Sequence, residues 1–244
     1  MTEWARDFKT ILQLVRPRKS TDHASQMEAF YKDQADDYDH FRNKLLPARE
    51  ELFKMIEKWN PGPVWVDIGA GTGFNLECID LKFFNEIYLV DLSSALLEIA
   101  RKRKEKLTDK FTDKKIHLVH QDINDFDLQQ KVDLITFSYS LTMIPDWFSA
   151  IDKAIKLLKP GGILAVADFH IPTQEPDNTT QVQKFFANCF WPSWFSWDGV
   201  HFSRDHVKYL KTHFDVVFYE QDVHELPYLP FSQVPYYLLI GRKK

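Results

Sequence analysis

The chain has few cysteines and no excess of positive charge. Only Cys78 and Cys189 occur among 244 residues, without a pairing pattern or a metal-type spacing, which is typical of reduced thiols in a cytosolic protein. The formal net charge of -4 leaves no basic footprint for a nucleic acid. We therefore expect no disulfide framework, no metal site and no nucleic-acid partner.

Long hydrophobic runs are also missing. No apolar stretch approaches the roughly 20 residues of a membrane span, and the first residues, with Glu3 and Asp7, lack the apolar core of a signal peptide. A chain of 244 residues has the size of one α/β domain with small additions. We expect a cytoplasmic location, with or without peripheral contact to a membrane.

A strand followed by a glycine-rich turn is the most informative local pattern. The stretch 64–73, Val-Trp-Val-Asp-Ile-Gly-Ala-Gly-Thr-Gly, predicts a buried strand that runs into a tight turn and then a helical segment at 74–84. Glycines allow the backbone to turn sharply and to approach a ligand closely. The third glycine comes one residue too early for the dinucleotide fingerprint, because Phe74 stands in that position. The pattern therefore disfavours NAD.

Strands and helices alternate along the rest of the chain, which favours a doubly wound α/β fold. Further strands are expected at 87–90, 116–119, 132–137, 163–168, 216–219 and 235–241, the last two as an antiparallel hairpin. Helices are expected at 48–59, 93–110, 146–158 and 201–211. Asp91 closes the second strand, where one carboxylate can accept hydrogen bonds from both hydroxyls of a ribose. A helix N-cap at the same position is compatible with that role.

Two segments extend beyond a minimal fold. We predict that residues 1–60 form a helical segment over the ligand site and that residues 61–244 form the core. The first 19 residues predict a basic amphipathic helix, which either lies in a membrane interface or packs on the domain. An insertion at 169–202 is dense in aromatic residues, whose faces attract cations and whose rings could receive acyl chains; the alternative is a small core of its own.

With Asp67 two residues before Gly69, the glycine turn resembles the first motif of class I S-adenosylmethionine-dependent methyltransferases. The run Leu-Lys-Pro-Gly-Gly at 158–162 is typical of the same family. The resemblance implies a Rossmann-like α/β fold with a seven-stranded, mostly parallel sheet, and S-adenosylmethionine as cofactor, with S-adenosylhomocysteine as product. A plain β–α turn in another doubly wound fold is the alternative. The cofactor-binding residues expected on this basis are Tyr31, Tyr38, Asp67, Gly69, Gly71, Gly73, Asp91, Leu92, Asp122, Ile123 and Ser138.

A closer resemblance is to the N-methyltransferase component of betaine-lipid synthase. It covers the stretches 29–31, 34–39, 45–52, 138–145, 190–192 and 234–237. The stretch 138–145 also lacks the Asn-Pro-Pro-Tyr or Asp-Pro-Pro-Tyr pattern of many enzymes that methylate nucleobases or glutamine. The family converts diacylglyceryl-homoserine to its trimethylated betaine lipid. The resemblance implies a lipid substrate at a membrane surface and a homoserine-lipid-forming enzyme, on a separate polypeptide or on a part of the protein outside this chain.

The chemistry indicates which side chains to look for. Holding the amine in line with the methyl group should contribute more than a base, because effective molarities reach about 10⁵ to 10⁸ M whereas a base adds about 10² to 10⁴. We hypothesise that Tyr139 and His170 form a catalytic pair, although a histidine beside a strand end is more often structural. The candidates for binding the substrate are Arg42 or Arg49 for the carboxylate, and Trp191 and Trp194.

Three functions remain open from the sequence. The first is the lipid-head-group N-methyltransferase. The second is a methyltransferase for phosphatidylethanolamine or a small-molecule amine. The third is a cofactor-binding scaffold protein that keeps the fold without the chemistry.

Overall fold

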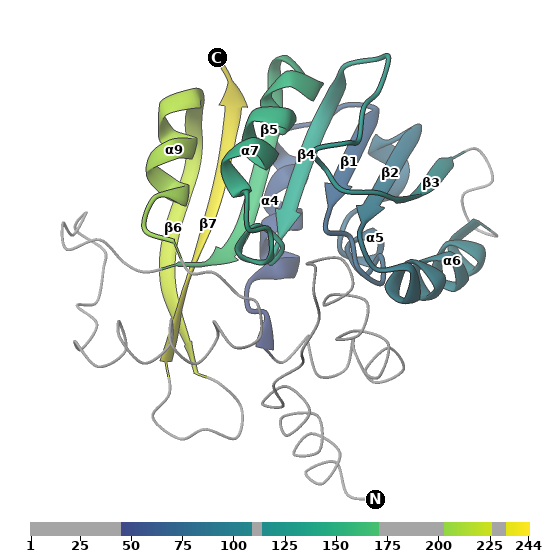
Figure 1. Cartoon of the computed structure of the whole chain (residues 1–244), viewed down its shortest axis with the longest axis horizontal. Helices are drawn as coiled ribbons and strands as arrows, with labels where there is room; N and C mark the ends of the chain where they lie inside the picture. Colours follow the sequence, from purple (N-terminus) through teal and green to yellow (C-terminus); the bar gives the residue numbers. More distant parts are fainter. Residues whose placement is uncertain (1–44, 109–113, 171–202, 226–232) are drawn as a thin grey trace, which may run out of the picture.

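A computed structural model of the chain describes residues 45–108, 114–170, 203–225 and 233–244. These residues contain seven strands: β1 Val64–Ile68, β2 Glu86–Asp91, β3 Lys115–His120, β4 Val132–Ser138, β5 Leu158–Phe169, β6 Phe214–Glu225 and β7 Gln233–Lys243. They form one sheet in the order β3-β2-β1-β4-β5-β7-β6 (Figure 1). The first five strands are parallel, and β7 is antiparallel to both β5 and β6. The predicted seven-stranded class I methyltransferase fold is confirmed.

The described helices are α4 Arg49–Lys58, α5 Asn75–Cys78, α6 Ser94–Thr108, α7 Trp147–Leu157 and α9 His206–His213, with two 3₁₀ turns, η1 Leu81–Phe83 and η2 Leu141–Met143. They cover both faces of the sheet. Side chains of α4 and α6 pack with Trp65 of β1 in one core, whereas side chains of α7 and α9 pack with Val66 in the other. Consecutive residues of β1 thus serve opposite faces, as the alternation of side chains along a strand requires.

The order of the strands determines where a ligand can bind. From β1 the chain runs outward through β2 to β3 and then returns to the other side of β1 as β4. The loops that leave β1 and β4 therefore diverge at the carboxyl edge of the sheet. A crevice at such a switch point is the usual ligand site of an open α/β sheet.

Several predicted boundaries differ from the structure. The helical segment expected at 74–84 is split into α5 and η1, because Ile79 between them is extended and buried in the core. β5 begins at Leu158 rather than at 163, since Leu158 pairs with Val132 before the register shifts. β6 runs to Glu225, well past the expected end at 219, because it stays paired with β7 along its whole length. As an edge strand with many half-buried or exposed residues, it lacks a strong apolar pattern.

The predicted division of the chain falls partly outside the described residues. Of the expected cover at 1–60 only the part from residue 45 onward is described, and of the insertion at 169–202 only its first two residues. The division therefore stays a prediction. Across the described ranges, no helix combines the length and apolar character needed to cross a membrane. The same ranges contain no group of three or more His, Cys, Asp or Glu side chains arranged to hold a metal ion.

Candidate functional site

A pocket lies at the carboxyl ends of β1, β2 and β4. The glycine turn forms its floor, and the start of α4, the loop after β3 and the segment after β4 complete its wall. The predicted residues that line it are Arg49, Gly69, Gly71, Asp91, Leu92, Asp122, Ile123, Ser138 and Tyr139. The predicted residues Tyr31, Tyr38, Arg42, Trp191 and Trp194 lie outside the described residues. The pocket thus brings together segments that are far apart in the sequence.

The glycine turn brings the backbone against the pocket floor. Gly69 and Gly71 have φ angles of 69° and 56°, in the left-handed region that favours glycine. A Cβ on Gly69 would lie 2.3 Å from Cβ of Ser140, so the turn also packs tightly against the end of β4. The Gly69 N–H donates to the carbonyl of Val90 over 2.8 Å, which fixes the turn to the end of β2. No larger residue could replace Gly69 without displacing Ser140.

Asp91 is fixed by backbone donors at the rim of the pocket. Its Oδ2 accepts from the Gly71 N–H at 2.7 Å, and its Oδ1 accepts from the Ser93 N–H at 2.8 Å. Burial raises the pKa of this carboxyl, although its hydrogen bonds to these amides oppose the rise. The N-cap of α6 is Ser93, whose Oγ accepts from the Leu96 N–H, so Asp91 remains available to a ligand. Each carboxylate oxygen keeps further acceptor capacity for a vicinal diol.

Asp67 lies beneath the pocket and does not line it. Its Oδ1 accepts from Oγ1 of Thr136 at 2.6 Å, and its Oδ2 accepts from Nδ2 of Asn75 at 2.9 Å. Burial raises the pKa of this carboxyl to about 6. The residue that faces the pocket is Asn75, so Asp67 orients a lining residue. Gly73, also predicted to bind cofactor, lies outside the lining and permits close packing, because a Cβ there would meet Leu89 and Ala100 at 3.1 and 3.2 Å.

Two residues in the pocket wall each carry a buried polar atom without a partner. Asn75 and Ser138 line the pocket, and Asn75 Oδ1 and Ser138 Oγ have no hydrogen-bond partner in the part of the chain that the structure describes. Buried polar atoms in proteins are nearly always paired, so such atoms indicate a missing partner. An amide oxygen can accept from an ammonium, which is what the amino-acid end of S-adenosylmethionine offers. These residues therefore fit that cofactor.

The loop after β3 forms the opposite end of the pocket. Asp122 Oδ1 accepts from the Asn124 N–H at 2.8 Å, which fixes the carboxylate in a tight turn. Ile123 beside it is only 4% exposed and packs into the core. A carboxylate with an apolar neighbour suits an aromatic ring that carries an exocyclic amine, as adenine does.

Tyr139 lies in the pocket wall, but its phenol is already engaged. Its hydroxyl donates to the carbonyl oxygen of Pro47 at 2.6 Å, and its ring packs against Phe169 with a centroid distance of 4.8 Å. Burial raises the pKa of the phenol well above its usual value.

His170, the other half of the predicted catalytic pair, does not line the pocket. Its ring lies 5.4 Å from that of Tyr237, and burial lowers its pKa to about 4. Within the described residues, the structure does not bring His170 and Tyr139 together at the pocket. The His170 N–H donates to the carbonyl of Pro235 in β7 at 3.2 Å, and the residue is buried beside that strand.

Arg49 stands at the start of α4, beside the glycine turn. Its guanidinium lies 5.3 Å from the centroid of the Phe74 ring, and its charge opposes the rise that burial causes in the pKa of both Asp67 and Tyr139. A cation in this wall can meet a carboxylate, whether from the cofactor or from an acceptor.

Asp168 was not predicted to belong to the site. It is the penultimate residue of β5, has no exposed surface, and accepts from the Thr142 hydroxyl at 2.7 Å and from the Thr142 N–H at 3.1 Å. Burial raises its pKa to about 6. Through Thr142 it fixes η2 and the lining residues that follow. Its signal in the sequence was an acid at the end of a strand, the feature that identified Asp91.

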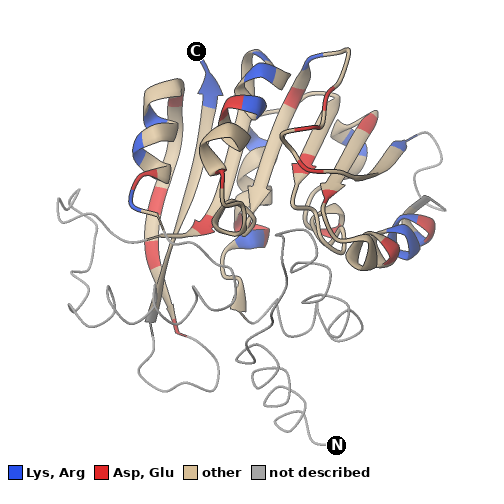
Figure 2. Cartoon of the chain, in the orientation of Figure 1, with Lys and Arg blue, Asp and Glu red and all other residues tan. Residues whose placement is uncertain are grey.

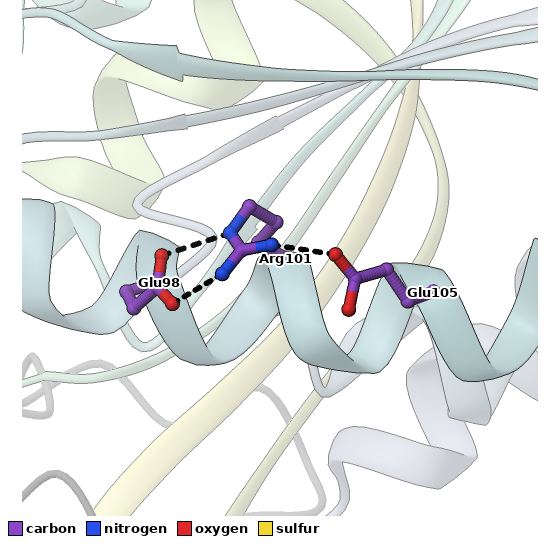
Figure 3. A network of polar contacts seen from close by, with 3 residues as sticks. All are labelled: Glu98, Arg101 and Glu105. Atoms are coloured by element: carbon purple, nitrogen blue, oxygen red, sulfur yellow. Dashed lines mark hydrogen bonds and ion pairs between the residues drawn. The ribbon is translucent and has the colours of Figure 1, made fainter.

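The contact of Arg103 with the glycine turn was also not predicted, because a basic run such as 101–104 is typical of a solvent-exposed helix face. Figure 2 shows Lys and Arg interspersed with Glu along α6. Arg101 fits that interpretation, since it pairs with Glu98 and Glu105 on the exposed side (Figure 3). Arg103 instead donates to the carbonyl oxygen of Thr72 and to Glu77 at 2.6 Å. Arg103 therefore links the glycine turn to α6 through the carbonyl of Thr72.

Comparisons with known proteins agree with this geometry. Residues 38–217 match a family model described as a methyltransferase domain. A demethylmenaquinone methyltransferase of Clavibacter sepedonicus is 24% identical over 152 residues, 60% of this chain and 59% of that protein. The chain spans about half the length of the curated relatives it matches.

Two solved structures share the fold at 16% sequence identity and a TM-score of 0.59. The N-methyltransferase NodS from Bradyrhizobium japonicum WM9, in complex with S-adenosylhomocysteine, aligns over 80% of this chain and 85% of its own. The 1,6-didemethyltoxoflavin N1-methyltransferase of Burkholderia thailandensis aligns over 93% of this chain and 94% of its own.

Proposed function

Because the chain belongs to the family of methyltransferase domains, we propose that it is an S-adenosylmethionine-dependent N-methyltransferase. We propose further that its acceptor is the amino group of diacylglyceryl-homoserine, which it methylates successively to the trimethylated betaine lipid. The product from the cofactor is S-adenosylhomocysteine.

One observation carries the cofactor assignment. Asp91 is held at the pocket rim by the N–H groups of Gly71 and Ser93, in the position from which a carboxylate can bind a ribose. Asn75 Oδ1 at one end and Asp122 with Ile123 at the other supply acceptors and an apolar surface for the remaining parts of the cofactor. The bound cofactor would supply a methyl group on a positively charged sulfur.

Three observations support an amine lipid as the acceptor. Two of the three described stretches that carry the resemblance to betaine-lipid N-methyltransferases, 45–52 and 138–145, contribute to the pocket. The first does so through Leu46 and Arg49, and the second through Ser138, Tyr139, Ser140, Met143, Ile144 and Pro145. The segment after β4 also places Met143, Ile144 and Pro145 at the wall, which gives an apolar side suited to a lipid. The two fold neighbours described above are both N-methyltransferases by name.

The chain's own contribution is mainly positioning. Asp91 and Asp122 would fix the depth of the cofactor, and η2, held by Asp168, would place the acceptor in front of it. Correct alignment is worth more than a base in such a displacement.

The test is transfer of labelled methyl groups by the purified chain, with binding of S-adenosylhomocysteine measured by calorimetry. We expect transfer to diacylglyceryl-homoserine, and we expect Asp91→Ala to weaken cofactor binding by about 1.5 to 3 kcal/mol, the worth of a hydrogen bond to a charged group. The control is Asp127→Asn, at an exposed position outside the pocket lining, which should bind cofactor as the wild type does.

Other acceptors should be assayed side by side. Phosphatidylethanolamine and small amines test the same chemistry on other head groups, and demethylmenaquinone is included because a relative bears that name. If the chain binds the cofactor and transfers methyl groups to only one of these compounds, that compound is the acceptor instead of diacylglyceryl-homoserine. Cofactor binding without transfer to any acceptor would leave the cofactor-binding scaffold protein, and absence of cofactor binding would overturn the enzymatic proposal.

A further inference from the structure

We propose that Tyr139 is a positioning residue whose phenol holds the segment 46–49 in place as a wall of the cofactor pocket. This inference rests on the proposed function, since it assigns Tyr139 to cofactor binding rather than to proton transfer.

The donor side of this contact is rigid. The Tyr139 N–H donates to the carbonyl of Ala167 at 2.7 Å, so its backbone is fixed to the end of β5. The residue is 8% exposed, and its ring packs against Phe169. The hydroxyl can therefore reach few partners, and it donates to the carbonyl oxygen of Pro47 over 2.6 Å.

The segment that accepts this hydrogen bond contains a strained residue, which the hydrogen bond helps to keep in place. Ala48, directly after Pro47, has a φ of 55°, which is unfavourable for a residue with a Cβ. Tyr139 itself has a φ of 56°. The hydrogen bond thus joins one strained residue, Tyr139, to the residue directly before the other, Ala48, and strain of this kind persists only where the surroundings enforce it. The carbonyl of Ala48 then accepts from the Leu52 N–H at 2.9 Å, which starts α4.

The segment held in this way forms part of the pocket. Leu46 and Arg49, on either side of Pro47 and Ala48, both line it, and Arg49 lies over the ring of Phe74 in the same wall. Release of Pro47 would let both side chains move away from the cofactor. The raised pKa also keeps the phenol protonated at neutral pH, so no phenolate is present to accept a proton, in agreement with a structural use of its hydroxyl.

The variant Tyr139→Phe removes only the hydroxyl. We expect the Kd for S-adenosylhomocysteine, measured by calorimetry, to rise by about 3- to 10-fold, as loss of one neutral hydrogen bond predicts. At saturating cofactor, kcat and the shape of its pH profile should match those of the wild type. Tyr209→Phe is the control, because that hydroxyl donates to Asp152 at 2.6 Å, away from the pocket, and its loss should not change the Kd.

Hydrogen exchange supplies the structural readout. In cofactor-free protein, the Leu52 amide should exchange faster in Tyr139→Phe than in the wild type or in Tyr209→Phe. The variant Leu46→Ala trims the wall and keeps the hydrogen bond, so it should raise the Kd while the Leu52 amide keeps its protection.

The outcomes separate the two proposals. A wild type that fails to bind S-adenosylhomocysteine overturns the proposed function. A wild type that binds, with Tyr139→Phe binding equally well and exchanging equally slowly, overturns the inference alone. A large loss of kcat with an altered pH profile and an unchanged Kd would make Tyr139 an acid–base residue and also overturn it. Should Tyr139→Phe not fold, an unchanged Kd in Leu46→Ala decides against the inference.

Discussion

At the scale of single residues, two arginines on one helix show how burial decides the role of a charge. Arg101 and Arg103 are two positions apart, so they point in different directions around α6. The side chain of Arg101 is 50% exposed, and its ion pairs with Glu98 and Glu105 are of the kind that contributes little to stability. The side chain of Arg103 is 13% exposed and contacts both Glu77 and the carbonyl of Thr72 in the glycine turn.

Exchanging each arginine for glutamine tests this difference. Arg103→Gln should weaken binding of S-adenosylhomocysteine by about 10-fold, because the turn loses a charge-assisted hydrogen bond. Arg101→Gln, which has the same change in charge, should leave the Kd within about twofold of the wild type. Calorimetric titration at one ionic strength makes the comparison. Equal effects of the two changes would mean that the overall charge of α6, not the Thr72 contact, affects binding.

At the scale of elements, the glycine turn depends on both backbone conformation and space. Gly69 and Gly161 have similar φ angles, 69° and 72°. A Cβ at Gly69 would lie 2.3 Å from Cβ of Ser140, whereas a Cβ at Gly161 would meet nothing within 4 Å. Ser140 is itself held by its hydroxyl, which donates to the carbonyl of Ile68 at 2.6 Å. The end of β4 cannot move aside without breaking that bond.

Alanine at each glycine separates the two effects. Gly161→Ala should lower the free energy of unfolding by about 1 to 2 kcal/mol, because alanine disfavours a positive φ, and it should keep cofactor binding. Gly69→Ala should cost more and should also abolish cofactor binding, because the clash displaces the turn and the end of β4 together. Urea unfolding and calorimetry measure the two quantities. A Gly69→Ala variant that binds S-adenosylhomocysteine normally would contradict the tight packing of this turn.

At the scale of the whole molecule, buried carboxyls make stability depend on pH. The pKa of Asp67 rises from 3.8 in its ordinary environment to about 6 in the fold because the side chain is buried. The folded state therefore keeps the proton more strongly than the unfolded chain, so this group's stabilising contribution is complete below about pH 4 and is lost as the pH rises through 6.

The variant Asp67→Asn lacks this titration. Its unfolding free energy, relative to the wild type, should increase by up to about 3 kcal/mol between pH 4 and pH 7, since each pKa unit is worth about 1.4 kcal/mol. The Asn75 amide can turn so that Oδ1, which has no partner among the described residues, accepts from the new amide group. Denaturant unfolding at several pH values gives the curve. A difference between variant and wild type that does not change with pH would show that Asp67 titrates normally.

The sequence by itself determined the α/β alternation, the glycine turn and the acid at the end of β2. These features are local, because each follows from neighbouring residues. They are a β-favouring run, a positive φ at glycine and a carboxylate at the end of a strand. Gly69, Gly71 and Asp91 accordingly line the pocket. Asp122 and Ser138, which the family resemblance implied, line it as well, and cofactor binding by all five stays a prediction.

The tertiary structure alone decided which side chains reach the pocket and which are engaged elsewhere. Tyr139 and Pro47 are 92 positions apart, and Arg103 is 31 from Thr72, so no local pattern indicates either contact. Asp67 and His170 are buried away from the lining for the same reason: their surroundings come from strands and helices distant in the sequence. Orientation and burial depend on packing between elements, and a sequence pattern records only the face on which a residue stands.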